Sequence, residues 1–154
     1  NGLGVFLGNF SRLSANPQQR AAEASAFEVL DFLGMADLAQ ALPHELSYGR
    51  QKEVEFGRAL MQKARLVLLD EPMAGMSDTE KAAMTALILK VRHQLGVSFL
   101  IVEHDMPVIM DLSDNIVVLD FGRKIAEGTP AEVQAHPEVI TAYLGSSKLE
   151  EKHI

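Results

Sequence analysis

The sequence contains no cysteine, and it lacks the long apolar or basic runs that mark several classes of protein. Without cysteine, neither a disulfide scaffold nor a thiolate metal site can form. No apolar run approaches the roughly 18 residues that a membrane-spanning helix needs, and no basic stretch followed by an apolar one opens the chain as a secretion signal. The formal net charge of -7 argues against a general affinity for nucleic acid, whose phosphates need clustered lysine and arginine. We therefore expect no nucleic-acid partner.

Hydrophobic spacing divides the 154 residues into a helical front and a mixed α/β remainder. Residues 1–17 are rich in glycine, asparagine and serine and are predicted to be mostly loop. Apolar residues at helical spacing predict the helices of the front, which cover residues 19–33, 37–41 and 51–63. Gly34 is placed to end the first of these helices.

The remainder alternates strands and helices, which is typical of an α/β domain with a parallel sheet. Short apolar runs predict buried strands at residues 66–69, 97–102 and 115–119. Ser77 and Glu80 form a capping-box pair, which predicts the start of a helix after the first strand. The apolar stripe of that helix consists of Met84, Leu87, Ile88, Val91 and Leu95, and Gly96 closes it.

The third strand leads into a predicted hairpin, with a turn at residues 120–123 and a returning strand at 124–126. Pro107 is expected to start a short helix before that strand. We predict a helical subdomain over residues 1–64 and an α/β part over 65–147. The charged residues 148–154 are expected to form a flexible tail.

Two carboxylates, Asp70 and Glu71, follow the first predicted strand directly. Ligands bind at the carboxyl ends of the strands in open parallel sheets. One carboxylate can hold Mg²⁺, and its neighbour can accept a proton from an attacking water. Taken alone, the pair is equally explained by a strand that ends in a polar turn before Pro72.

Residues 46–51, Leu-Ser-Tyr-Gly-Arg-Gln, place a hydroxyl group and a glycine at the start of a helix. Backbone N–H groups at such a position can bind phosphate oxygens, helped by the helix dipole. By itself, Ser47 is also explained as a helix cap. His104 ends the second predicted strand, where an imidazole can touch a phosphate or an attacking water, although a lone histidine is more often structural.

The order and spacing of these segments resemble those of the ABC ATPase family. Residues 46–49 (L-S-Y-G) are similar to its signature motif, residues 66–72 (L-V-L-L-D-E-P) to its Walker B segment, and His104 to its switch histidine. Further stretches are similar to the branched-chain amino acid importer branch, and these are E-H-D-M at 103–106, S-D at 113–114, A-E-G-T-P at 126–130 and A-Y-L-G at 142–145. The resemblance covers residues 20–145.

The resemblance implies an α/β fold: an incomplete P-loop NTPase (ABC ATPase) parallel sheet with a helical signature subdomain. It implies ATP and Mg²⁺ as cofactors, with Asp70 helping to hold the metal. Glu71 would polarise the attacking water, and His104 would sense the γ-phosphate. The residues implied to contact ATP held by a second subunit are Ser47, Tyr48, Gly49, Arg50 and Gln51.

The implied function is that of the ATP-hydrolysing subunit of an ABC importer for branched-chain or related amino acids. Its partners would be a second ABC ATPase subunit, identical or different, and transmembrane permease subunits. The implied location is the cytoplasmic face of a bacterial-type inner membrane. Two alternatives stay open: a soluble ABC ATPase outside transport, and a truncated, non-catalytic interaction module. The residues do not name the transported substrate.

The sequence departs from the family pattern most clearly in its phosphate loop. No G-x-x-x-x-G-K-[ST] motif occurs, since no lysine follows Gly2, Gly4 or Gly8 in that pattern. We expect a central slot of the sheet to be empty, with apolar faces exposed. We also expect the chain alone to bind ATP weakly or not at all, and the full gene product to extend upstream by about a hundred residues. Ser77 also stands where many members carry an aspartate.

Overall fold

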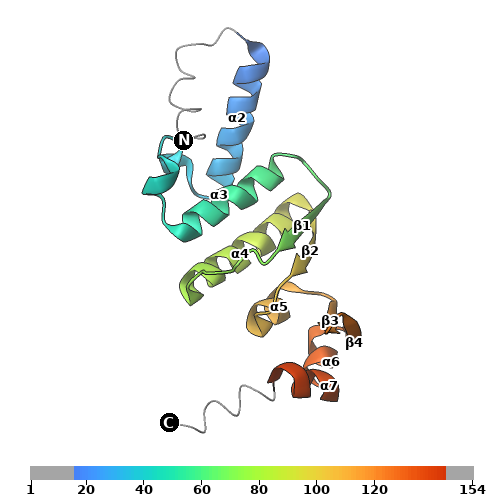
Figure 1. Ribbon diagram of the computed structural model, residues 1–154. Helices are drawn as coiled ribbons and strands as arrows, with labels where there is room; N and C mark the ends of the chain where they lie inside the picture. The colour runs from blue at the N-terminus through green and yellow to red at the C-terminus, as the bar shows by residue number, and fades with distance from the viewer. Residues whose placement is uncertain (1–15, 145–154) are drawn as a thin grey trace. The chain divides into compact units, whose positions relative to one another are not determined.

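A computed structural model describes residues 16–144 of the chain (Figure 1). The chain divides into two compact units, the first ending at Glu103 and the second beginning at His104. The sequence predicts a different boundary, between residues 64 and 65, from the motifs on either side of it. That boundary stays a prediction. The predicted tail at 148–154 and most of the predicted loop at 1–17 lie outside the described residues.

The first unit opens with two helices, α2 (Pro17–Phe32) and α3 (Tyr48–Leu60), with short 3-10 turns between them at Ala36–Leu38 and Pro43–Glu45. α2 starts two residues earlier than predicted because proline suits the first helical position, where no intrahelical N–H bond is needed. The side chain of Asn16 caps this start by accepting a hydrogen bond from the N–H of Gln18 at 3.0 Å. Gly34 adopts a φ of 70° just beyond the helix, as the sequence predicts.

α3 begins at Tyr48 and ends at Leu60, three residues earlier at each end than the predicted helix at 51–63. Lys63 has a φ of 52°, which a right-handed helix cannot accommodate. Gly57 of α3 lies close to Leu33 and Val29, since a Cβ there would lie 2.7 Å from Cδ1 of Leu33 and 3.3 Å from Cγ1 of Val29. The absence of a side chain at Gly57 leaves room for these two residues.

The rest of the first unit is a β-α-β arrangement of β1 (Leu66–Asp70), α4 (Asp78–Leu95) and β2 (Ser98–Val102). The two strands are parallel, with Leu66 opposite Ser98 and Asp70 opposite Val102, so the predicted parallel pairing is confirmed. α4 starts with the predicted capping box of Ser77 and Glu80, and it ends at Gly96 in the left-handed conformation.

The two faces of the β1–β2 sheet differ in burial. On one face Val67 is buried, and the ring of Phe99 stacks on Phe56 of α3 with centroids 5.9 Å apart. The other face leaves four large apolar side chains exposed, and these are Leu66, Leu68, Leu100 and Val102. This exposed face agrees with the apolar faces expected beside an empty slot of the sheet. The prediction that the strands at 66–69 and 97–102 are buried is wrong for this face, because side chains cover only the opposite one.

The core side of α4 is formed by Met84, Ile88 and Val91, which belong to the predicted apolar stripe. Leu87 is half-buried. Leu95 was also predicted for this stripe, but its side chain is 52% exposed. Leu95 is the last residue of α4, and the left-handed conformation of Gly96 ends the helix there. The prediction that Leu95 belongs to the buried stripe is therefore wrong.

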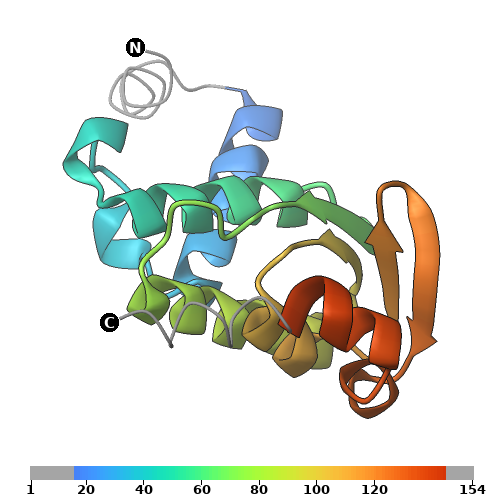
Figure 2. The same cartoon turned by 60° about the horizontal axis from the view of Figure 1, so that its bottom comes forward.

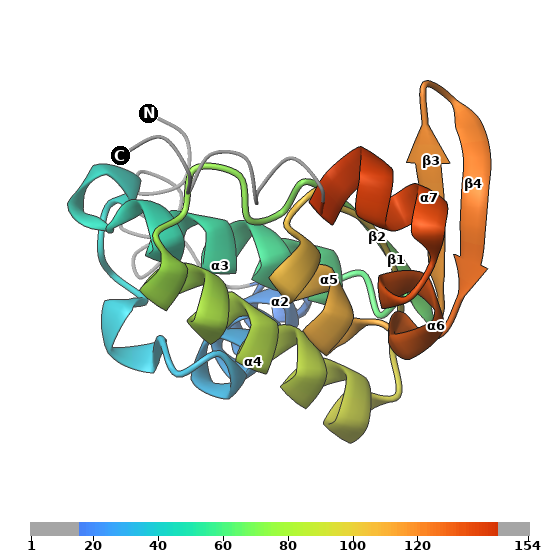
Figure 3. The ribbon, with the colours of Figure 1, turned by 90° about the horizontal axis from the view of Figure 1, so that it is seen from below.

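The second unit contains α5 (Met106–Leu112), β3 (Ile116–Asp120), β4 (Arg123–Gly128), α6 (Pro130–Gln134), α7 (Pro137–Val139) and a π-helical turn at Ile140–Leu144. β3 and β4 pair antiparallel, so the predicted hairpin is confirmed. Its two turn residues, Phe121 and Gly122, both have positive φ, which matches the right-handed twist of the strands. Figure 3 shows α6 and α7 lying beside this hairpin.

Candidate functional site

Asp70 and Glu71 are exposed at the carboxyl edge of the β1–β2 sheet. The N–H of Glu71 donates to the carbonyl oxygen of Val102 at 2.9 Å, so the acid pair is held against the end of β2. Glu71 has a φ of 42°, a region that non-glycine residues rarely adopt. Such strain costs about 1–3 kcal/mol and gathers at functional sites, which supports a functional role for this carboxylate.

A third carboxylate, that of Glu103, follows β2 directly. Its Oε1 accepts a hydrogen bond from the N–H of Met73 at 3.1 Å, and Met73 is only 1% exposed. This bond ties the loop after the acid pair to the neighbouring strand. The sequence motifs do not predict this role of Glu103. Its position could have indicated it, because Glu103 follows the second strand directly, as the acid pair follows the first.

The acid pair suits a divalent cation that a phosphate helps to hold. Mg²⁺ is usually bound by one or two carboxylates together with substrate phosphates, and an exposed Asp70 at the sheet edge meets that requirement. Among residues 16–144, no three histidine, aspartate or glutamate side chains gather into a metal site.

Residues 47–51, here called the 47–51 turn, form the start of α3. Ser47 is its N-cap, and its Oγ accepts a hydrogen bond from the N–H of Arg50 at 3.4 Å. The side-chain amide of Gln51 donates to the carbonyl oxygen of Leu46 at 3.0 Å. Arg50 forms an ion pair with Glu53 at 2.6 Å. These contacts hold the turn in a defined shape.

The start of α3 lies beside the loop that leads from the acid pair to α4 (Figure 2), and the 47–51 turn contacts both this loop and the first turn of α4. The hydroxyl of Tyr48 donates to the carbonyl oxygen of Ala74 at 3.0 Å. The N–H of Gly49 donates to Oε1 of Glu80 at 3.0 Å. Gly75, with a φ of 76°, lies against the Tyr48 ring. The structure thus brings together two segments that the sequence predicted separately.

Comparisons with known proteins relate the chain to one family. Residues 5–74 match the family model described as ABC transporter, and residues 123–148 match the model described as branched-chain amino acid ATP-binding cassette transporter. The high-affinity branched-chain amino acid transport ATP-binding protein BraF of Pseudomonas aeruginosa is 37% identical over 139 residues, 88% of this chain. The chain is a homologue of ABC transporter ATP-binding proteins.

Other similar proteins support the same relationship. The corresponding protein LivG of Escherichia coli (strain K12) is 34% identical over 144 residues, 91% of this chain. A solved ATP-binding cassette of an ABC transporter, in its ADP conformation, is 29% identical with a TM-score of 0.74, over 94% of this chain and 57% of that chain. The predicted ABC ATPase fold is therefore confirmed. The chain spans about half the length of the curated relatives, 54% of BraF and 56% of LivG.

In this ABC homologue the side chain of Glu80 receives three hydrogen bonds. Its Oε2 accepts from the N–H and the Oγ of Ser77 at 2.9 and 2.8 Å, and its Oε1 accepts from Gly49. The bonds from Ser77, followed by that from Gly49, hold the pKa of Glu80 below its usual value of 4.5. The capping box was predicted from the sequence, whereas the bond to Gly49 was not.

His104 occupies the predicted position directly after the end of β2. It is exposed, and it is followed by Asp105, the N-cap of α5, whose side chain accepts a hydrogen bond from the N–H of Val108 at 3.4 Å. The role of His104 as a phosphate sensor stays a prediction.

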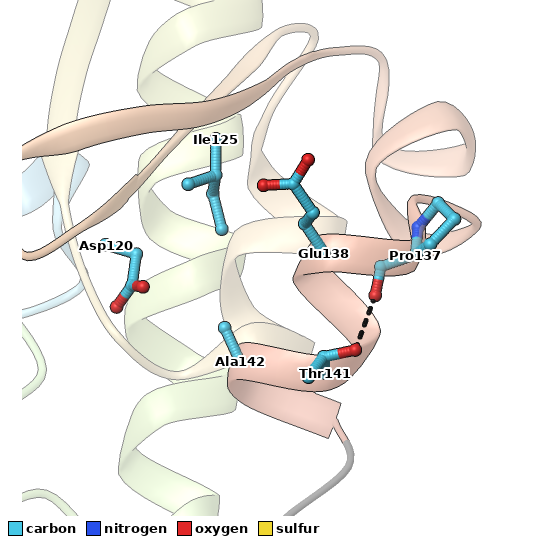
Figure 4. Close-up of a pocket in the computed structure, with 6 residues that line it drawn as sticks. All are labelled: Asp120, Ile125, Pro137, Glu138, Thr141 and Ala142. Carbon is cyan, nitrogen blue, oxygen red and sulfur yellow. Dashed lines mark hydrogen bonds between the residues drawn. The ribbon is translucent and has the colours of Figure 1, made fainter.

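An open hollow of about 380 Å³ lies in the second unit of the ABC homologue (Figure 4). Two carboxylates, Asp120 and Glu138, stand on its walls among apolar and neutral groups. None of the predicted site residues lines it. None of the helices in residues 16–144 has the length and apolarity needed to cross a bilayer.

Proposed function

We propose that the protein is the ATP-binding and ATP-hydrolysing subunit of an ABC importer for branched-chain or related amino acids. The observation that carries this proposal is the exposed acid pair at the carboxyl edge of a parallel sheet, in a chain 37% identical to BraF. BraF and LivG are both named as branched-chain amino acid transport ATP-binding proteins.

The acid pair supplies the proposed chemistry. Phosphoryl transfer asks a protein mainly for positioning and charge neutralisation. Asp70 would hold Mg²⁺ together with the nucleotide phosphates, and Glu71 would accept the proton of the attacking water. The bond from its N–H to Val102 holds the strained backbone of Glu71 at the end of β2. His104 would contact the γ-phosphate.

The 47–51 turn would serve a nucleotide held by a second ABC ATPase subunit, identical or different. Ser47 and Tyr48 are exposed, which supports contact with another chain, while Gly49 is buried. We place Arg50 and Gln51 in the same contact because they continue the turn into the first turn of α3. Transmembrane permease subunits complete the proposed assembly, and this subunit would lie at the cytoplasmic face of a bacterial-type inner membrane.

The proposal is tested by isolating the assembly that contains this sequence from membranes of its source organism. We expect a protein with several membrane spans to co-purify, and we expect ATP turnover that requires Mg²⁺. Turnover without any associated membrane protein would favour a soluble ABC ATPase and contradict the transport role.

A second candidate, a non-catalytic interaction module, is favoured by one observation. The 154 residues contain no G-x-x-x-x-G-K-[ST] motif, so this chain does not itself supply the usual phosphate cradle. Under this alternative, the isolated assembly would show no ATP turnover, and the acid pair could be replaced without loss of partner binding.

A further inference from the structure

The N–H of Gly49 already has an anionic partner. Under the proposed function this amide contacts a phosphate, yet here it donates to Oε1 of Glu80 at 3.0 Å. We propose that Glu80 is an internal anion that occupies the Gly49 amide until a nucleotide phosphate displaces it. The inference rests on the proposed function, because the phosphate would come from the nucleotide that a second subunit holds.

The side chain of Glu80 covers the Gly49 amide as well as bonding to it. Gly49 is buried, and a Cβ built on it would lie 2.6 Å from Oε1 and 2.9 Å from Cγ of Glu80. A phosphate oxygen therefore cannot reach this N–H while the carboxylate stays in place. Access to the amide requires the Glu80 side chain to move.

Electrostatics favours exchange of the two anions over simultaneous binding. The N-terminus of α3 attracts negative charge through N–H groups that lack a partner inside the helix and through the helix dipole. Glu80 and a phosphate would compete for the same N–H, and two like charges about 4 Å apart repel even in water. The carboxylate would therefore hold the site in the absence of a nucleotide and oppose weakly bound anions.

The two carboxylate oxygens of Glu80 accept from different donors, so the exchange breaks only the bond from Gly49. Oε2 holds the N–H and Oγ of Ser77 in the capping box of α4, while Oε1 alone reaches Gly49. Rotation of the half-buried side chain can release Gly49 and keep the bonds to Ser77. The start of α4 then stays capped while the amide becomes available.

The second unit offers a matched control. Glu132 forms the same capping box with Thr129, accepting hydrogen bonds from its N–H and its Oγ at 2.8 Å each. Both glutamates have a lowered pKa, chiefly through the N–H of their capping partner. Only Glu80 adds a bond to the start of another helix, so Glu80→Gln and Glu132→Gln differ in that bond.

The first part of the test examines the contact itself in the 154-residue chain labelled with nitrogen-15. Hydrogen bonds to a charged acceptor are stronger than those to a neutral one. In Glu80→Gln we therefore expect the Gly49 amide proton to shift upfield and to exchange faster with solvent. Glu132→Gln should leave it unchanged. A Gly49 signal that is the same in all three proteins would overturn the proposal at this step.

The second part titrates the same proteins with tripolyphosphate, which carries the phosphate chain of ATP, and follows the Gly49 amide. We expect about fivefold tighter binding to Glu80→Gln than to the wild type and Glu132→Gln, the size of one like-charge contact in water. Equal or weaker binding to Glu80→Gln would show that Glu80 only positions the turn. The absence of any response at Gly49 would also overturn the proposal.

These outcomes are separate from those that test the proposed function. The titration needs neither a second subunit nor hydrolysis, so it can fail while the isolated assembly still turns over ATP. Conversely, loss of the importer role would leave the bond between Glu80 and Gly49 and its response to tripolyphosphate measurable.

Discussion

The hydroxyl of Tyr48 donates a hydrogen bond to the carbonyl oxygen of Ala74 at 3.0 Å. This bond joins the first residue of α3 to the loop that leads away from Asp70 and Glu71. With the neighbouring bond from Gly49 to Glu80, it connects the 47–51 turn to that loop and to the first turn of α4.

Tyr48→Phe removes this connection and keeps the ring. We expect a loss of about 0.5–1.5 kcal/mol in the free energy of unfolding, the usual net value of one hydrogen bond. Amide exchange at residues 74–76 should become faster. Tyr143→Phe is the control, because Tyr143 makes the same kind of bond to the carbonyl oxygen of Leu119. It should cost similar stability without affecting residues 74–76, and equal exchange in both variants would contradict the coupling.

Glu103→Ala should destabilise the loop after the acid pair. It removes the acceptor of the nearly fully buried Met73 N–H, and an unsatisfied buried donor costs about 1–3 kcal/mol. Urea unfolding measures this loss. Glu103→Gln keeps an oxygen that can accept the bond, so its loss should be clearly smaller. Equal stability of the alanine variant and the wild type would mean that the bond does not hold the loop.

Local signals in the sequence predicted much of this fold. The Ser77–Glu80 pair and Gly96 mark the two ends of α4 because capping depends on residue type at fixed short spacing. The acid pair was placed at the carboxyl end of β1 by its position after an apolar run. In such cases the residues that define the feature are neighbours in the chain.

The contacts between segments were beyond prediction from spacing. Gly49 and Glu80 lie 31 residues apart, and no local rule relates a helix start to the capping residue of another helix. The positive φ of Glu71 also depends on tertiary contacts, since its N–H bonds to Val102 on a different strand. The sequence therefore predicts which residues belong to the candidate site. It does not predict the hydrogen bonds that these residues form in the folded chain.

Glu80→Gln should also change how stability depends on pH. The pKa of Glu80 is lower in the folded chain than its usual value of 4.5, mainly because the N–H and hydroxyl of Ser77 donate to it. Its stabilising effect is therefore fully present above the unfolded pKa and is lost as the pH falls through the folded pKa. Urea unfolding between about pH 6 and pH 3 should show a shallower loss of stability for the variant. Parallel curves would contradict this assignment.

The 154-residue chain by itself should bind ATP weakly or not at all. The sequence lacks the glycine-rich loop with lysine that binds phosphates in P-loop proteins. The acid pair alone offers too few interactions to bind a nucleotide tightly. A titration with a fluorescent ATP analogue, with and without Mg²⁺, measures this. Micromolar binding that depends on Mg²⁺ would show that the chain contains a complete nucleotide site.

The most direct test of the account is the steady rate of ATP hydrolysis by the isolated assembly after Glu71→Gln. A general base contributes about 10²–10⁴-fold to a rate, so we predict a loss of at least about a hundredfold. Glu28→Gln, at an exposed position on α2, is the control and should leave the rate unchanged. A Glu71→Gln assembly that hydrolyses ATP as fast as this control would contradict the proposed role of the acid pair.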